Sequence, residues 1–191
     1  KGINIVILEA SSHGLDQKRL DYVNFKAAAF TNLSRDHLDY HKSMKNYLNS
    51  KLYLFNNLLN KKTSCITDKG NFFFKKLEKI SKRRRININS IGYGCGNLKI
   101  LGQKYKKDFQ EIDFLYNNKT YELKTSLFGR YQIKNLLSAI LLAEKCGLSI
   151  QKSLKKTKYI KPAKGRLECI KKLKNNSKIF VDFAHTPDAL E

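Results

Sequence analysis

The chain has 191 residues, of which 41% are hydrophobic, so it is long enough for one sizeable domain, or for one domain and part of another. Its formal charge of +22 suggests nucleic-acid binding, but lysine greatly outnumbers arginine and only Lys82–Arg85 forms a compact basic run. We interpret the charge as a solvated surface that attracts anionic substrates, and we expect neither a nucleic-acid partner nor a membrane span.

The chain opens on a short apolar run, Asn4–Glu9, which predicts a central parallel strand already under way at the first residue. We therefore expect the chain to be truncated at its N-terminus. The run ends in Glu9, followed by the polar stretch Ser11–Gly14. A carboxylate, two hydroxyls and a histidine directly after a buried strand are typical of a ligand loop, although a capped turn is an equally open alternative.

A second predicted strand, Phe25–Leu33, leads into the most unusual stretch of the chain. Two aspartates, an arginine and two histidines fall within the seven residues Arg35–His41. The carboxyl ends of parallel strands are where α/β proteins place ligand sites. If the two strands are neighbours, Glu9 and His37 lie at the same edge of one sheet.

The helix predicted after this stretch is capped by Ser43 and runs to about Asn57. At 3.6 residues per turn, Lys51 falls in the middle of its apolar face, between Leu48 and Phe55. A lysine in that position must extend its amine to solvent, pair with a carboxylate or be chemically changed.

The chain then alternates between strands and helices, which predicts a doubly wound, mostly parallel α/β sheet. The elements are a strand at Ser64–Thr67, a helix at Asn71–Lys82 and a strand at Ile86–Tyr93. Gln110–Leu123 then predicts a β-hairpin that turns at an Asn-Asn pair, and hence a small antiparallel β side-sheet.

An apolar helix follows, ending at Cys146, and Ser149 caps another that runs to about Lys158. A loop around Pro162 precedes a strand at Ile179–Phe183, after which Thr186–Glu191 begins a new helix. We place a domain boundary at this loop, giving domains at residues 1–161 and 162–191.

The side chains after the first two strands suit Mg²⁺ rather than zinc, because they are carboxylates and imidazoles without a Cys-x-x-Cys pair. They are Glu9, Asp36, His37 and Asp39. Magnesium beside a basic surface indicates phosphate chemistry. No G-x-x-x-x-G-K-[ST] loop occurs, so an ATP-dependent enzyme would carry that loop upstream of Lys1.

Four segments, in this order, together resemble the Mur ligases of peptidoglycan synthesis: Glu9–Leu15, Phe30–His41, Gly165–Glu168 and Asp182–Leu190. The resemblance covers nearly the whole chain. It implies the central ATPase domain without its phosphate loop, followed by the start of the C-terminal domain. Tyr131-Gln132 departs from the family's usual Phe-Asn, Lys42 from a glycine and Phe183 from a tyrosine.

The resemblance also implies a role for each matching residue. Glu9 and His37 correspond to Mg²⁺ ligands, and Lys51 corresponds to a lysine that becomes a ligand after carbamylation; all three are expected to be catalytic. The remaining matches divide into substrate-binding and nucleotide-binding positions. Ser11, Gln17 and Arg19 correspond to residues that hold the UDP-MurNAc-dipeptide; Asn32, Asn135, Arg166, Asp182 and His185 correspond to residues near ATP.

The activity implied is ATP-dependent amide formation that adds meso-diaminopimelate to UDP-MurNAc-L-Ala-D-Glu through an acyl phosphate. The enzyme is expected to be a cytoplasmic monomer, and the chain alone, without the phosphate loop, is expected to be inactive. Alternatives are the L-lysine-adding ligase, a related enzyme such as folylpolyglutamate synthase and, outside this class, a basic nucleic-acid-binding protein.

Overall fold

The computed structural model describes residues 2–175 and 177–185 of the chain. The elements alternate between strands and helices along most of it. In order they are α1 (Ser12–Asp16), β1 (Ala27–Phe30), α2 (Leu38–His41), α3 (Met44–Tyr53), the π-helical turn η1 (Leu54–Leu58), β2 (Ser64–Asp68), α4 (Phe74–Arg84), β3 (Asn87–Tyr93), β4 (Leu98–Tyr105), β5 (Gln110–Tyr116), β6 (Lys119–Thr125), α5 (Arg130–Lys145), α6 (Ile150–Thr157), β7 (Glu168–Lys172) and β8 (Lys178–Val181).

One sheet of six strands, in chain order from β1 to β6, forms the centre of the molecule. β1 to β4 run parallel, whereas β5 and β6 are antiparallel to their neighbours. The prediction of a doubly wound, mostly parallel sheet with antiparallel strands at its side is confirmed. The predicted hairpin forms β5 and β6, and its bonds to β4 make it an extension of the central sheet. A separate antiparallel pair, β7 and β8, follows α6.

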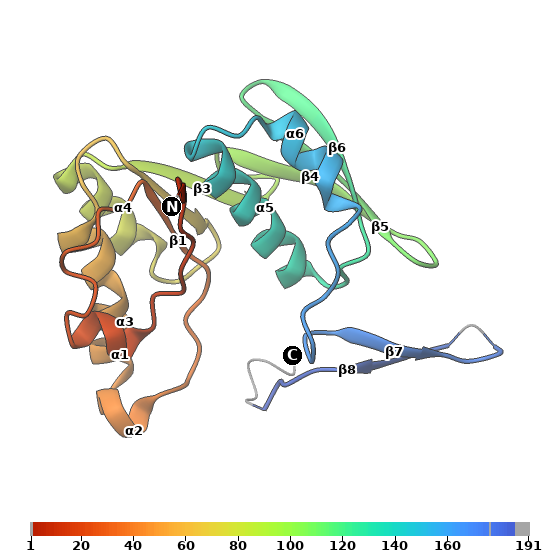
Figure 1. Ribbon diagram of the computed structural model, residues 1–191, viewed down its shortest axis with the longest axis horizontal. Helices are drawn as coiled ribbons and strands as arrows, with labels where there is room; N and C mark the ends of the chain where they lie inside the picture. The colour runs from red at the N-terminus through yellow and green to blue at the C-terminus, as the bar shows by residue number, and fades with distance from the viewer. Residues whose placement is uncertain (1, 176, 186–191) are drawn as a thin grey trace.

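The sheet has a hydrophobic core on each face, because neighbouring residues of a strand point to opposite sides. In β2, Cys65 and Ile66 are both fully buried, yet they belong to different cores. Cys65 lies in the core that includes Phe55 and Leu77, under α3, η1 and α4. Ile66 lies in the core that includes Leu137, under α5 and α6. The fold therefore has three layers, with helices on both sides of the sheet (Figure 1).

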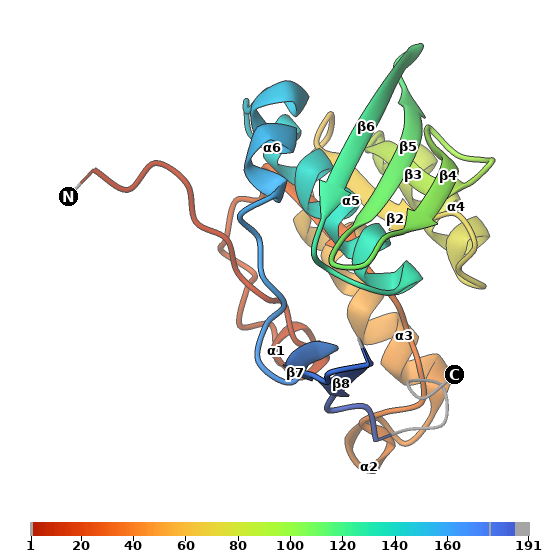
Figure 2. The same ribbon diagram turned by 90° about the vertical axis from the view of Figure 1, so that its right-hand side faces the viewer.

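The predicted central strand at Asn4–Glu9 is wrong for this structure. Residues 2–11 belong to no strand, and Ile7 in the middle of the run is 92% exposed. Figure 2 shows this segment extending away from the body of the molecule before α1. An apolar run favours burial, but a strand also needs a neighbour to receive its backbone hydrogen bonds. In the described sheet, β1 is an edge and the run does not pair with it.

The helix predicted from Ser43 is present, and the Ser43 hydroxyl accepts a hydrogen bond from the Asn46 amide. Regular α-helix ends at Tyr53, and η1 continues the chain as a π-helical turn to Leu58. The Ser149 cap of α6 is also confirmed. The helix expected at residues 186–191 lies outside the described residues. In the described part of the chain, none of the helices combines the length and the apolar character that crossing a membrane requires.

Candidate functional site

The residues expected to hold the dipeptide substrate lie on either side of α1. Ser11 caps this helix, since its hydroxyl accepts a hydrogen bond from the Gly14 amide at 3.1 Å. Gln17 donates to the hydroxyl of Tyr40 at 3.3 Å and accepts a hydrogen bond from the Arg19 guanidinium. The segment is therefore both a capped turn and a cluster of polar side chains, so the two interpretations of its sequence do not exclude each other. The hydrogen bond from Gln17 to Tyr40 connects this segment to α2.

His37 stands at the N-terminus of α2 with φ 53° and ψ 27°, in the left-handed region of the backbone map. The Asp36 carboxylate accepts a hydrogen bond from the His37 amide at 2.8 Å, and its other oxygen lies 3.6 Å from Nε2 of the imidazole. Both side chains are almost half exposed. The imidazole is therefore oriented by its neighbour but still open to a ligand.

The ring contacts of three histidines and two tyrosines join α1, α2 and α3. His13 lies 5.0 Å from His37, 4.2 Å from Tyr40 and 5.4 Å from His41, measured between ring centroids. His41 in turn stacks on Tyr47 of α3 at 5.1 Å. Burial lowers the pKa of His41, and the nearby His13 lowers it further, so this imidazole is neutral at pH 7.

Lys51 is half-buried on α3, with its Nζ 5.1 Å from the centre of the Tyr47 ring. Burial lowers the pKa of Lys51, while the charges of Glu9 and Asp36 act in the opposite direction. The two carboxylates and the amine therefore share one electrostatic environment. Glu9 thus lies near enough to Lys51 for its charge to act on the amine, although Glu9 ends no strand here.

An unmodified lysine cannot ligate a metal ion, because its ammonium group has donors only. Within residues 2–175 and 177–185, no three His, Cys, Asp or Glu side chains lie close enough together to hold a metal ion unaided. For a cation held by Glu9 and His37, Lys51 could add a third protein ligand only after losing its positive charge.

A pocket of about 510 Å³ opens between α1, α2 and α3, beside this cluster. Its lining combines charged, amide and aromatic side chains. The lining residues are Leu15, Asp16, Lys18, Tyr40, His41, Lys42, Asn46, Asn49, Ser50 and Tyr53.

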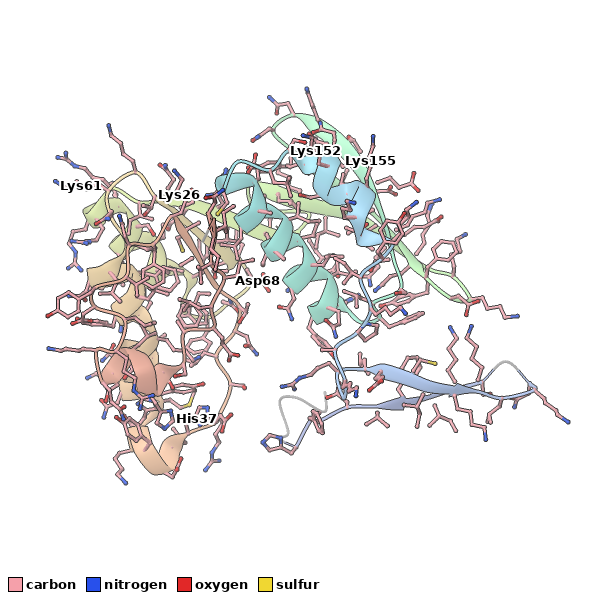
Figure 3. All side chains as sticks on the ribbon, viewed as in Figure 1. Lys26, His37, Lys61, Asp68, Lys152 and Lys155 are labelled. Atoms are coloured by element: carbon pink, nitrogen blue, oxygen red, sulfur yellow. The ribbon has the colours of Figure 1, made fainter. Side chains whose placement is uncertain are left out.

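A second polar group lies at the carboxyl ends of β2 and β3, and sequence reasoning missed it. Asp68, the last residue of β2 and labelled in Figure 3, forms an ion pair with Lys134 of α5, and both side chains are partly buried. The Tyr93 ring at the end of β3 faces Arg130 and Lys134 at 5.3 and 5.6 Å. The sequence did offer a signal for this group, because Asp68 is a carboxylate at the end of the strand predicted at Ser64–Thr67. A carboxylate at the end of a predicted strand is also the pattern that indicated Glu9.

The two asparagines expected near the nucleotide belong to this edge of the sheet. Asn32 follows β1, and Asn135 lies in the second turn of α5; both are exposed. Asn71, after β2, donates a hydrogen bond to the Thr31 carbonyl at 3.1 Å, which joins the ends of β1 and β2. The carboxyl edge thus presents amides and cations together, a combination suited to a nucleotide.

The third group lies in the segments that flank the β7–β8 hairpin. Asp182 accepts hydrogen bonds from the amides of Leu167 and Ala184, both at 2.7 Å. Arg166 is exposed, and its carbonyl accepts a hydrogen bond from Gln132 of α5 at 3.3 Å. His185 is exposed and bonds to the carbonyl of Phe183. The predicted residues therefore fall into three groups: at α1–α3, at the carboxyl edge of the sheet with the start of α5, and beside the β7–β8 hairpin.

The labelled lysines in Figure 3 project from the end of the molecule away from His37. Lys26, Lys61, Lys152 and Lys155 are all exposed. These four positive charges therefore lie on solvated surface outside the polar groups described above.

The model of the Mur ligase middle domain matches residues 1–143. Curated proteins named UDP-N-acetylmuramoyl-L-alanyl-D-glutamate–2,6-diaminopimelate ligase are 35% identical in Chelativorans sp. (strain BNC1) and 37% identical in Rickettsia bellii, over 190 residues each. Each alignment covers 100% of this chain and 39% of the relative. The chain thus spans well under half the length of these relatives.

Solved structures give the same likeness. A ligase structure with that printed name superposes with a TM-score of 0.79 at 27% identity, covering 95% of this chain and 37% of that one. MurF from Acinetobacter baumannii gives 0.76 at 18% identity, covering 89% of this chain and 36% of that one. The apo form of L. casei FPGS gives 0.71 at 16%, covering 89% and 41%. At these lower identities the likeness concerns the fold.

Proposed function

Because the chain belongs to the Mur ligase family, we propose that it forms most of the ATP-dependent middle domain of a ligase that adds meso-diaminopimelate to UDP-MurNAc-L-Ala-D-Glu. The observation that carries the proposal is the half-buried Lys51, whose pKa is lowered by burial and which shares its surroundings with Glu9 and Asp36. An ordinary surface lysine has no such environment. The names of the relatives favour diaminopimelate over L-lysine as the amino acid.

The chemistry of Lys51 fits a magnesium site. A lowered pKa increases the fraction of neutral amine, which is the form that reacts with carbon dioxide to give a carbamate. The carbamate is anionic and presents oxygen, the donor that Mg²⁺ prefers. Mg²⁺ held by Glu9, His37 and carbamylated Lys51 would neutralise the repulsion between the substrate carboxylate and the γ-phosphate of ATP.

The other groups of residues bind and orient the two anionic substrates. Ser11, Gln17 and Arg19 lie on one short segment, where Arg19 supplies a positive charge for the dipeptide end of the UDP-linked substrate. Asn32 and Asn135 stand at the carboxyl edge of the sheet, where the nucleotide is proposed to lie. The γ-phosphate is transferred to the D-glutamate carboxylate, the amine of the incoming amino acid attacks the acyl phosphate, and phosphate leaves.

Arg166, Asp182 and His185 are proposed to contact ATP from the connection to the next domain. We place the division between residues 1–161 and 162–191, close to the loop that precedes β7. We also propose a cytoplasmic monomer. The cysteines support a reducing compartment, since Cys65, Cys95, Cys146 and Cys169 are all free thiols.

The test is phosphate release by the complete protein that contains this chain, with ATP, Mg²⁺, UDP-MurNAc-L-Ala-D-Glu and meso-diaminopimelate. The expected result is release that requires all four, and little release when UDP-MurNAc-L-Ala replaces the dipeptide substrate. The matched reaction with L-lysine should be much slower. Faster release with L-lysine would replace diaminopimelate in the proposal. Release that requires a folate and glutamate instead of the UDP-linked substrate would overturn it.

A further inference from the structure

His41 is a buried polar side chain to which the proposed function gives no role. It is 4% exposed, and each of its ring nitrogens faces a hydroxyl group. Nε2 lies 3.0 Å from Ser12 Oγ in α1, and Nδ1 lies 3.4 Å from Ser50 Oγ in α3. The imidazole therefore spans the space between two helices that carry different groups of proposed site residues.

The hydrogen-bond network around His41 assigns a direction to each bond. The Ser50 hydroxyl has one proton and lies 3.0 Å from both the Asp16 carboxylate and the Asn46 carbonyl, and the carboxylate is a stronger acceptor than a neutral imidazole. With Ser50 donating to Asp16, Nδ1–H of His41 donates to Ser50, and Nε2 is left to accept from Ser12. Tyr40 donates to the other oxygen of Asp16 at 3.0 Å. Each of these donors has an acceptor when the ring is neutral.

The face of the His41 ring makes a second contact, independent of its edge. It stacks on Tyr47 with an interplanar angle of 22° and 5.1 Å between centroids. The Tyr47 ring is the one over which Lys51 Nζ lies, also at 5.1 Å. Packing on His41 thus limits how far the Tyr47 ring can turn, and with it the place of the amine.

We propose that His41 is a positioning residue with two separable functions: its edge fixes the α1 segment that carries Ser11, Gln17 and Arg19, and its face fixes Tyr47 and Lys51. The proposal rests on the proposed function, because it concerns how the substrate-binding segment and the modified lysine are held relative to each other. Neither contact requires His41 to touch substrate.

Two substitutions separate the edge from the face. His41→Phe keeps a ring that can stack on Tyr47 but loses both hydrogen bonds. His41→Gln keeps an amide oxygen that can accept from Ser12 but has no ring. Ser12→Ala is the matched control, since it removes the α1 hydrogen bond from the other partner.

In the complete protein, loss of the hydrogen bond between His41 and Ser12 should weaken binding of the UDP-linked dipeptide. We expect His41→Phe and Ser12→Ala each to raise its KM by about tenfold with kcat within about twofold, and the double variant to add little to either. His41→Gln should instead lower kcat by about tenfold while this KM stays within about twofold.

A readout that does not need activity is the reactivity of the Lys51 amine, measured by trace acetylation and peptide mass spectrometry. We expect faster labelling in His41→Gln than in wild type and an unchanged rate in His41→Phe. If both variants change KM, kcat and labelling alike, His41 supports only the fold and the proposal is overturned. If the wild-type protein shows no ligation, the proposed function fails, whereas the labelling contrast still decides the positioning role.

Discussion

The hydroxyl of Tyr131 donates a hydrogen bond to Asp182 at 3.2 Å, which ties the first turn of α5 to the segment after β8. Partial burial acts to raise the pKa of Asp182, but the hydrogen bonds from the Leu167 and Ala184 amides and from Tyr131 outweigh it and hold the pKa below its ordinary value. Gln132 bonds to the same connection. Both residues that depart from the family's Phe-Asn pair therefore contact the segments that flank the β7–β8 hairpin.

Replacing Tyr131 by phenylalanine should make the segments that flank the β7–β8 hairpin more mobile without disturbing the core. The lost hydrogen bond is exposed, so global stability should change by less than about 1 kcal/mol. Amide hydrogen exchange at Leu167 and Ala184 should become faster in Tyr131→Phe. Tyr53→Phe is the matched control, because Tyr53 donates to Asp21 at 3.1 Å far along the chain. Unchanged exchange at Leu167 and Ala184 would contradict the coupling.

Lys51→Ala in the complete protein should abolish turnover, because alanine cannot form a carbamate and would remove one protein ligand from the proposed magnesium site. Small carboxylates such as acetate should restore part of the activity by supplying that ligand in solution. Lys45→Ala, on the polar side of the same helix, serves as the control and should keep its activity. The assay is phosphate release with all substrates present, and full activity of Lys51→Ala would remove Lys51 from the proposed mechanism.

The turn between β4 and β5 holds the β7–β8 hairpin through Asp108, which pairs with Lys172 and with Lys178 at 3.4 Å. The hydrogen bond from Lys172 is the main cause that lowers the pKa of Asp108. A lowered folded-state pKa means that the contribution to stability is present above the ordinary pKa of the residue and is lost as pH falls through the lowered value.

Asp108→Asn should therefore loosen the hairpin at pH 7, and the difference from wild type should disappear in acid, below the ordinary aspartate range of about 3.9. Backbone amide NMR shifts of β7 and β8, followed from pH 7 downward, give the measurement. Glu122→Gln removes a comparably exposed pair with Lys124 on the central sheet and should leave these shifts alone. Equal hairpin shifts in Asp108→Asn and wild type at pH 7 would exclude this role.

The four cysteines should divide by reactivity. Burial strongly raises the pKa of the Cys65 thiol, which is fully enclosed, whereas Cys95, Cys146 and Cys169 are exposed. Because the thiolate is the reactive form, three thiols should react quickly with Ellman's reagent at pH 8 and the fourth only after denaturation. Cys65→Ala should retain the three fast thiols and lack the slow one. Four fast thiols in the wild type would contradict the packing of β2.

Local features of the fold could be predicted from the sequence because their causes are local. Ser43 and Ser149 cap helices a few residues away, and helical periodicity placed Lys51 on a face that is indeed half-buried. The prediction of a strand at Asn4–Glu9 was wrong because a strand needs a partner strand, and the residues of this run do not determine whether one is present. The π-helical turn at Leu54–Leu58 also could not be predicted, because predicting a helix from apolar spacing assumes the 100° per residue of a regular α-helix.

In the candidate site too, features with local causes could be predicted from the sequence, whereas contacts between distant residues could not. The density of polar residues after β1 indicated His37, and the family resemblance assigned roles to the positions that match it. The Asp68–Lys134 pair joins residues 66 positions apart, and His41 reaches Ser12 across 29. Contacts of this kind follow from how α1, α3 and α5 pack on the sheet, which residue patterns alone do not determine.

At His37, the residue that would give the most stable backbone differs from the residue that the proposed metal site needs. A non-glycine residue there costs roughly 1–2 kcal/mol, and glycine would relieve that strain. Glycine, however, carries no imidazole. An engineering programme guided by thermal stability alone would therefore favour replacing this histidine, and would obtain a more stable protein without the imidazole that we propose as a Mg²⁺ ligand.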